Sequence, residues 1–592
     1  MIASVLCLLI YFGLCVGALV CDGGLRRLKA GLRRLSPIHW GLLGLAAAGF
    51  LAFIYYWPRQ DRFVYFWDYA YYWNASVKLV RFIAENPLSE VLGTLYRSIN
   101  DVSYNLFLPT LLALPLSVFG CAFPRYVNAC CVLFLLPALL VQGMIVVKQA
   151  GDDAPNRGGL YVAAVIAAML LPANYCAVFH GYLDVAFLLP VSCAVYLLAD
   201  LDFRRVSPAR DVMIALLLVL IWICRRYTIF LIIGYVAALA VKAVAVLIED
   251  KGWKSLRPIV VNFLLIGLVS LGLLALCFGK FLLRALLTDY SDMYSAYSGS
   301  LAGKLAEVRG SFGVVALVLA LTSAALCLIY KKQVVNCLAL LVMGVSIPAM
   351  FFRIQNMGMQ HRMLLNVPVY TLCAMALIHW TPGLPLRRGC NAAVALCAIA
   401  MAVNFAAAFV PALPPSGTLL TERYTPYRRD DIDALNTLAD KLNALCPDPD
   451  RQDIYVSASG LVLNGDILQK LNMPDVEKTV PAICGSCDID LRDGFPHAFL
   501  TAGYVVTTDP VQTHLPSGQE VVVYPATQIQ DPESCIGRHY RLIDEVALDG
   551  GVTAKIYRKV SNYSRNDLRQ IQQHFAALYP DHPELFADRI RR

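Results

Sequence analysis

The chain has 592 residues, of which 58% are hydrophobic and 16% are charged, and its mean hydropathy is +0.59. Soluble domains average about 45–50% apolar and about 25% charged residues, so this composition excludes an ordinary soluble protein and indicates a polytopic membrane protein. The net charge of +8 is concentrated in short loops between apolar runs, which bears on membrane orientation and does not point to nucleic-acid binding.

Twelve apolar runs are candidates for membrane-spanning helices, each of which needs ~20 mainly apolar residues. The first, residues 1–20, has no basic region ahead of it and is followed by a basic cluster at 26–34, so it is predicted to be an uncleaved anchor. The others are residues 40–57, 126–147, 158–177, 185–199, 211–224, 227–248, 258–279, 312–330, 333–352, 363–380 and 390–411.

The basic loops predict the orientation, because short loops rich in lysine and arginine stay in the cytoplasm. These loops hold residues 26–34, Arg204/Arg205/Arg210, Lys251/Lys254/Arg257, Lys331/Lys332 and Arg387/Arg388. Threading the spans through them places residues 58–125, 178–184, 280–311, 353–362 and everything from about 412 outside. Within 58–125, the apolar run 106–120 has only fifteen residues and two prolines, so it is predicted to be re-entrant or interfacial.

Beyond about residue 412 the composition becomes polar. A helical pattern at 428–445 precedes four short apolar runs, and further helical pattern at 564–578 closes the chain. The four runs are residues 453–459, 503–508, 520–525 and 551–559. This alternation predicts a small extracytoplasmic α/β domain over 412–592, next to a transmembrane domain over 1–411.

Four cysteines lie in the polar region, namely Cys446, Cys484, Cys487 and Cys535. An even number of cysteines in an oxidising compartment predicts disulfides. Cys484-Gly-Ser-Cys487 also has the CxxC spacing of a redox or zinc site, but a second pair with that spacing is absent from the sequence.

A lone carboxylate stands out in VYFWDYAYYWNAS, residues 64–76, just beyond the second span. The aromatic residues fit an interfacial belt, since tyrosine and tryptophan favour that depth. The belt does not explain Asp68, whose carboxylate loses solvation beside apolar rings and should have a raised pKa unless it is paired. Asp68 is therefore a candidate general base, or a group that orients a sugar hydroxyl.

Two more carboxylates fall on the same predicted side. Asp101 precedes the run at 106–120, and Asp184 begins a span with His180 close by. Each could also be an ordinary helix cap or loop residue. The three isolated carboxylates together predict one polar face at the external end.

Basic residues interrupt the apolar pattern at that same end. Arg225 and Arg226 divide the stretch 212–248, either as a plain turn or as a phosphate-binding pair of guanidinium groups. A second cationic group holds Arg353, His361 and Arg362. Lys280 and Arg284 open a longer loop that includes Tyr290 and Tyr297, with the composition of a mobile lid over substrate.

In this order the motifs resemble the GT-C superfamily of integral membrane glycosyltransferases, which includes protein O-mannosyltransferases, the lipid A aminoarabinose transferase and the actinobacterial arabinosyltransferases. The resemblance covers roughly residues 40–410 as a pattern. It rests on FWDYAYYW, LFLPTLLALPLSVFG, PRYVNACC, LLPANYCAVFHGYLDVAFLLP, the Arg225-Arg226 pair and QHRMLLNVP. Many relatives carry an acidic pair in the first loop, where this chain has Asp68 alone.

The resemblance implies inverting transfer of a sugar from a polyprenyl-phosphate donor to an extracytoplasmic glycan, lipid or protein acceptor. Asp68 would be the base, with Asp101 and Asp184 supporting the acceptor or a metal. Arg225, Arg226 and Arg362 would contact the donor phosphate. The resemblance leaves open whether the reaction uses a divalent cation such as Mg²⁺ or Mn²⁺, which Asp68 or Asp184 would hold.

The expected location is a bacterial inner or plasma membrane, where membrane lipids surround the chain. Two alternatives stay open. A transporter or flippase of lipid-linked sugars could use the same charged residues without bond chemistry, although the sequence lacks the matching halves of many transporters. A membrane-anchored cell-envelope assembly protein could work through the C-terminal domain alone.

Overall fold

The computed structural model describes residues 1–590 apart from residues 103, 152–153, 155, 252, 381–387, 414–417, 449 and 472–478. The chain divides into two compact units. The first, here called the membrane unit, holds Met1–Arg59, Tyr71–Thr288 and Ser300–Thr425. The second, the C-terminal unit, holds Gln60–Ala70, Asp289–Gly299 and Pro426–Arg592. The boundary predicted at 411/412 is therefore incomplete, because two segments from distant loops belong with the C-terminal region.

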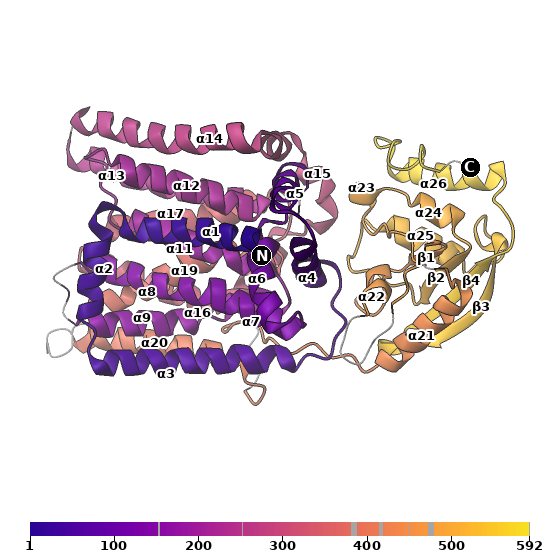
Figure 1. The fold of residues 1–592 in the computed structure, drawn as a ribbon, viewed down its shortest axis with the longest axis horizontal. Coiled ribbons are helices and arrows are strands. Elements are labelled where there is room, and N and C mark those ends of the chain that lie inside the picture. The colour runs from indigo at the N-terminus through magenta and orange to yellow at the C-terminus, as the bar shows by residue number, and fades with distance from the viewer. Residues whose placement is uncertain are drawn as a thin grey trace. The chain divides into compact units, whose positions relative to one another are not determined.

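The membrane unit is a bundle of helices, and its long members run alongside one another (Figure 1). Its helices are α1 (Ile2–Val20), α2 (Gly24–Arg33), α3 (Pro37–Tyr56), α4 (Trp67–Glu85), α5 (Leu88–Asp101), α6 (Phe107–Phe119), α7 (Phe123–Cys130), α8 (Leu136–Ala150), α9 (Arg157–Met169), α10 (Cys176–Phe179), α11 (Leu188–Ala199), α12 (Pro208–Cys224), α13 (Ile229–Glu249), α14 (Leu256–Leu287), α16 (Leu301–Ile329), α17 (Val334–Phe351), α18 (Met359–Arg362), α19 (Asn366–Ala374) and α20 (Arg388–Phe409). A π-helical turn, Cys131–Leu135, joins α7 to α8.

In the described part of the chain, nine helices are long and apolar enough to cross a membrane. They are Ile2–Val20, Pro37–Arg59, Phe123–Ala150, Arg226–Glu249, Leu256–Leu287, Leu301–Ile329, Val334–Phe351, Met359–His379 and Cys390–Phe409. The chain is thus a multi-pass membrane protein. The predicted spans 158–177, 185–199 and 211–224 correspond to the shorter helices α9, α11 and α12.

Two segments that were not predicted to be membrane spans are helical in the structure. The run at 106–120 folds as α6, a thirteen-residue helix about 20 Å long, which is too short to cross the bilayer core of about 30 Å. The predicted loop from residue 280 instead continues α14 as far as Leu287. Phe278 leaves helical geometry, so Lys280 and Arg284 occupy the last turns of α14 beyond a kink and not a loop.

The loops predicted to be cytoplasmic meet at one end of the bundle. Arg27 lies 3.6 Å from Asp200, and Arg204 forms an ion pair of 2.9 Å with Asp250. Gln333 donates a hydrogen bond of 2.7 Å to the carbonyl of Gln149. The helix α2 runs across the ends of the long helices there (Figure 1). Arg387, in another of these loops, lies outside the described residues.

The C-terminal unit is built on a four-stranded sheet in the order β1-β2-β4-β3. The pair β1/β2 is parallel, while β2/β4 and β3/β4 are antiparallel. The strands are β1 (Ile454–Ser457), β2 (Tyr504–Asp509), β3 (Tyr540–Ala547) and β4 (Thr553–Lys559). The helices are α15 (Tyr290–Met293), α21 (Ile432–Leu445), α22 (Gly465–Gln469), α23 (Asp490–Asp493), α24 (His497–Thr501), α25 (Glu520–Gln528) and α26 (Arg565–Leu578). The predicted small C-terminal domain of helices and strands is confirmed.

One apolar run of this domain is helical instead of extended. Residues 520–525 open α25, although valine and tyrosine favour strands. The Asp490 carboxylate accepts hydrogen bonds from the backbone N–H groups of Glu520 (2.9 Å) and Val521 (2.8 Å), so it satisfies donors that a helix start leaves open. The strand β3 was not predicted, because its apolar residues are interspersed with exposed charged ones.

The segment at 60–70 joins the C-terminal unit through its backbone. The N–H of Arg62 donates to the carbonyl of Tyr427, and the N–H of Arg429 donates to the carbonyl of Arg62, both at 2.8 Å. The Asp61 carboxylate accepts from the N–H of Tyr427 (2.9 Å) and from the Tyr65 hydroxyl (2.7 Å). These bonds form a short strand-like pairing that carries the chain to the start of α4.

Candidate functional site

An ion pair between Asp184 and Arg225 lies at the end of the membrane unit opposite the basic loops. The helix α12 begins near those loops and ends at Cys224, after which Arg225 takes an extended backbone conformation. Its Nε lies 2.7 Å from Oδ1 of Asp184, in the first turn of a 3₁₀ helix before α11. The Asp184 side chain is fully buried and that of Arg225 is 9% exposed. Two predicted site residues therefore form one buried pair.

Aromatic side chains enclose this guanidinium. The Arg225 Cζ lies 4.7 Å from the ring centre of Tyr72, 5.2 Å from Tyr227 and 5.5 Å from Tyr104. Rings within about 6 Å of a guanidinium attract it through their quadrupoles. The Tyr227 hydroxyl donates to Asp184 as well, so the carboxylate is shared between the two. We call Tyr72, Tyr104, Asp184, Arg225 and Tyr227 the Arg225 centre.

The predicted cationic loop reaches the same centre through His361. Its ring centre lies 4.6 Å from that of Tyr227 in an edge-to-face arrangement. Arg362, one residue later, binds residues outside the Arg225 centre. Its Nη1 donates to the carbonyl of Glu307 (2.7 Å) and lies 3.2 Å from the Glu422 carboxylate. Of the other predicted phosphate ligands, Arg226 is half-buried beside the centre and Arg353 is exposed.

Asp101 lies outside the Arg225 centre. It ends α5 and pairs with Lys280 at 3.3 Å, with side-chain exposures of 44% and 77%. Arg284 donates to the carbonyl of Val102 at 2.9 Å. A predicted catalytic carboxylate and two predicted lid cations thus form a surface contact between α5 and α14, of a kind that contributes about 0–1 kcal/mol.

Asp68 belongs to the C-terminal unit. It lies in the first turn of α4, whose residues up to Ala70 belong to this unit and whose later residues belong to the membrane unit, and the helix dipole favours a carboxylate at this position. The preceding residue, Trp67, has a φ of +46°, a left-handed conformation that bulky residues rarely adopt. The Trp67 N–H donates to Asp466, and its ring centre lies 4.6 Å from that of His514. Such strained residues occur preferentially at functional sites, because the surrounding structure must hold them.

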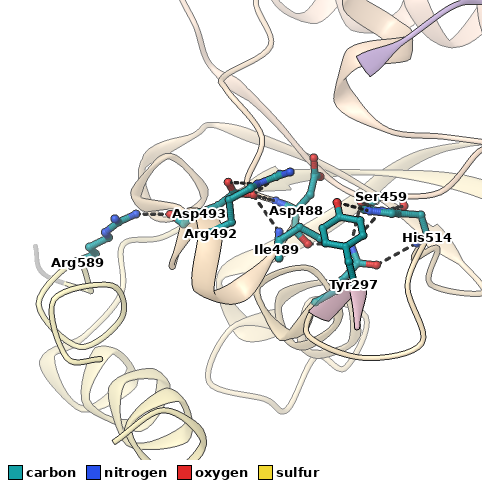
Figure 2. Close-up of polar contacts among 9 residues, drawn as sticks. Tyr297, Ser459, Asp488, Ile489, Arg492, Asp493, His514 and Arg589 are labelled. Carbon is teal, nitrogen blue, oxygen red and sulfur yellow. Dashed lines mark hydrogen bonds and ion pairs between the residues drawn. The ribbon is translucent and has the colours of Figure 1, made fainter. Parts of the chain in front are cut away.

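A polar cluster lies in the same unit, and Figure 2 shows its side chains. The Tyr297 hydroxyl, from the predicted lid, lies 3.3 Å from Nε2 of His514. The His514 Nδ1 lies 2.8 Å from the Ser459 hydroxyl, and the Gln519 Nε2 donates to that hydroxyl at 3.1 Å. Arg492 binds the neighbouring Asp493 at 2.7 Å. Tyr290 stacks on Tyr294 in the same segment, with ring centres 6.4 Å apart.

The order of groups in this cluster decides what it can do. A nucleophilic serine donates its proton to a histidine that a carboxylate orients. Here the His514 Nδ1 lies 3.0 Å from the carbonyl oxygen of Ser459 as well as 2.8 Å from its hydroxyl. Since a carbonyl can only accept, Nδ1 carries the proton and cannot take one from the Ser459 hydroxyl. The cluster consequently ties Tyr297 to the domain and does not form an acyl-transfer triad. Burial raises the pKa of Tyr297 to about 12, while Arg492 opposes and the charges of Asp488, Asp68 and Asp493 add to the rise.

Asp488 makes the stability of the C-terminal unit depend on pH. Burial raises its pKa to about 6, with Arg492 and the Ser459 hydroxyl opposing and Asp493 and Asp466 adding to the rise. A raised carboxyl pKa means that folding favours the protonated form, so the burial penalty appears as pH rises from about 4 through 6. Asp488→Asn should be as stable as the native chain near pH 4 and more stable by on the order of 3 kcal/mol above pH 7.

Thermal unfolding of both proteins between pH 4 and 8 measures this difference. Asp430→Asn is the matched control, because that carboxylate is exposed in the same unit and its replacement should give a constant offset. A gap between native and Asp488→Asn proteins that stays constant with pH would contradict the role of Asp488.

The cysteines are not paired. All nineteen of the chain carry free thiols, so the predicted disulfides among Cys446, Cys484, Cys487 and Cys535 are absent from this structure. Cys484 and Cys535 pack in the apolar core of the C-terminal unit, where a thiol behaves as a small hydrophobe. Within the described ranges, no three His, Cys, Asp or Glu side chains are grouped as metal ligands, whether around Cys484 and Cys487 or around Asp68 and Asp184.

Several residues of these two clusters were not predicted. Tyr72 was assigned to an interfacial belt, yet it is buried against Arg225. Tyr227 directly follows the arginine pair, and that adjacency could have identified it. Ser459, Asp488 and His514 are distant in sequence and carry no recognisable spacing.

No protein-family model matches the chain, and no curated protein sequence is significantly similar to it. The resemblance to GT-C glycosyltransferases therefore rests on the motif order alone.

Proposed function

We propose that the protein is a membrane glycosyltransferase that uses a polyprenyl-phosphate sugar donor, with the donor phosphate bound at the Arg225 centre. The observation that supports this proposal most directly is the buried Asp184–Arg225 pair at the end of the bundle away from the basic loops. An ionisable group inside a membrane bundle indicates a functional site by default, because its burial is expensive.

The chemistry of the Arg225 centre suits an anionic ligand. A guanidinium has five N–H donors, and the hydrogen-bonding partners of the Arg225 side chain among the described residues are Asp184 and Tyr227, which leaves donors for phosphate oxygens. The rings of Tyr72 and Tyr104 hold the planar group in one orientation. The Tyr72 hydroxyl is buried and has no hydrogen-bond partner in the described part of the structure, so a ligand oxygen would satisfy it.

In the proposed reaction, the acceptor hydroxyl attacks the anomeric carbon and the bond to the phosphate oxygen breaks. Asp68 takes the acceptor proton, and the polyprenyl phosphate leaves with its charge stabilised by Arg225 and Arg226. The sugar thereby changes anomeric configuration.

The direct test incubates the purified chain with a labelled polyprenyl-phosphate sugar and a cell-envelope acceptor fraction. The expected result is release of free polyprenyl phosphate together with transfer of the label. Movement of intact donor across a vesicle bilayer, without such release, would contradict the transferase and support a flippase.

A further inference from the structure

Three polar side chains of the C-terminal unit form a second hydrogen-bonded series, which shares no residue with the cluster around His514. The Ser561 hydroxyl lies 2.8 Å from Nδ1 of His539, and Nε2 of His539 lies 3.1 Å from Oδ2 of Asp567. The histidine and the aspartate are buried, with 6% and 3% of their surface exposed, whereas Ser561 is exposed. The series therefore runs from an accessible hydroxyl through an imidazole to a buried carboxylate.

The carboxylate decides which nitrogen of His539 carries the proton. A carboxylate only accepts hydrogen bonds, so Nε2 donates to Asp567, and Nδ1 of the neutral ring accepts from the Ser561 hydroxyl. Among the described residues, no carbonyl competes for this Nδ1, in contrast to that of His514. The two ring nitrogens are exchanged relative to a serine protease, but the order of serine, base and carboxylate is the same.

The environment of Asp567 keeps its carboxylate ionised. Its Oδ2 also accepts the Ser564 N–H at 2.9 Å, within the capping box that starts α26. Burial alone would raise the pKa of Asp567, but the hydrogen bonds from Ser564 and His539 hold that pKa below its ordinary value. The capping box explains why an aspartate begins this helix, but it does not involve Ser561.

The backbone holds the serine beside the ring. The N–H of Val560 donates to the carbonyl of His539 at 2.8 Å, which joins the residue before Ser561 to the histidine. The buried Tyr563 follows, and its ring centre lies 4.9 Å from that of His539. In the described part of the chain, the N–H groups of Ser561 and Asn562 donate to no protein atom, so they are available to stabilise an oxyanion.

We propose that Ser561 is a nucleophile for acyl transfer from carboxylic esters, with His539 as its base and Asp567 as the residue that orients the base. The Ser561 Oγ attacks the ester carbonyl carbon, and its proton passes to Nδ1 of His539. The bond to the alkoxy oxygen then breaks, and His539 returns the proton to the leaving alcohol. Water attacks the acyl-serine in the same way and releases the carboxylic acid and the free hydroxyl. This activity does not depend on the proposed glycosyltransferase function.

The test treats the purified full chain in detergent with a fluorophosphonate, which phosphonylates an activated serine and releases fluoride. We expect an adduct that mass spectrometry of the digested chain locates on Ser561, and Ser561→Ala should lose it. Ser517→Ala is the matched control, because it removes another exposed hydroxyl from the same unit and should leave the labelling rate unchanged. A native chain without an adduct on Ser561 would overturn the proposal.

Asp567→Asn tests the carboxylate while keeping an oxygen that can cap α26. Its labelling rate should fall about 10-fold or more, because the imidazolium that forms during attack loses its counter-charge. Ser564→Ala removes the capping hydroxyl and keeps the carboxylate, so it should lower thermal stability and label close to the native rate. Labelling that slows only in proportion to lost stability in these two variants would overturn the role of Asp567.

Ester hydrolysis gives a readout that needs no inhibitor. The native chain should hydrolyse p-nitrophenyl acetate faster than Ser561→Ala, with a transient acetyl group on the serine. Because Ser561 is exposed, its replacement should not disturb folding, and thermal unfolding of both proteins checks this. Equal rates of hydrolysis by the two proteins would overturn the acyl-transfer activity.

Discussion

Asp68→Asn should lower sugar transfer by about 10²–10⁴-fold while expression and donor binding stay close to native. A positioned general base contributes a factor of this size, and asparagine keeps the shape of the side chain but cannot accept the proton. Initial rates of polyprenyl phosphate release at saturating donor give the loss in turnover. Binding of the donor to the variant, measured separately, shows whether the phosphate site is intact.

Glu90→Gln is the control for this experiment, because it removes an exposed carboxylate from α5. It should transfer sugar at the native rate. If Asp68→Asn turned over at a rate within a factor of about three of the native enzyme, Asp68 would not be the base. If the variant lost donor binding as well, Asp68 would act on the donor site instead of the acceptor.

The second large effect concerns stability. Arg225→Met should destabilise the membrane unit by about 3–5 kcal/mol, because it leaves the fully buried Asp184 carboxylate without its cation. Replacing both partners, in Asp184→Asn/Arg225→Met, should recover much of that loss, since neither side chain is then charged. Thermal unfolding in one detergent, monitored by tryptophan fluorescence, compares the three proteins.

Arg362→Met provides the matched comparison within the same unit. Its partner Glu422 is 43% exposed, so water can solvate the carboxylate that remains, and the expected loss is less than half that of Arg225→Met. A double variant at 184 and 225 that unfolds no later than Arg225→Met alone would contradict the buried-pair explanation. Sugar transfer should be absent from both Arg225 variants, because the phosphate would lose its donors.

Motif order and loop charge predicted the general location of Asp184 and Arg225 correctly. Both follow or precede a helix at the end away from the basic loops, so the topology places them at the same depth. Their pairing could not be predicted, because it depends on the rotation of α11 and α12 about their axes. The cage around Arg225 also needs α4 and the segment at 104, which contribute through packing alone.

For Asp68, the sequence singled out the residue itself but not the contacts of its neighbourhood. The sequence identified the carboxylate as unusual, yet nothing local indicated that Trp67 would donate to Asp466, a residue 399 positions later. The helix at 520–525 has a similar cause, since Asp490 supplies the cap from thirty residues before. In both cases a tertiary hydrogen bond overrode a local propensity.

Finally, the assignment of residues 60–70 and 289–299 to the C-terminal unit has a consequence for biogenesis. During synthesis the first of these segments leaves the ribosome more than 360 residues before the strands that complete its fold, so closure of this unit is a late event of high contact order. Until then Phe63, Val64, Tyr65 and Phe66, all buried in the finished protein, stay uncovered. A holding chaperone that covers these side chains would protect the chain during this interval. A truncation at residue 425 would make it permanent, and the product would be prone to aggregate.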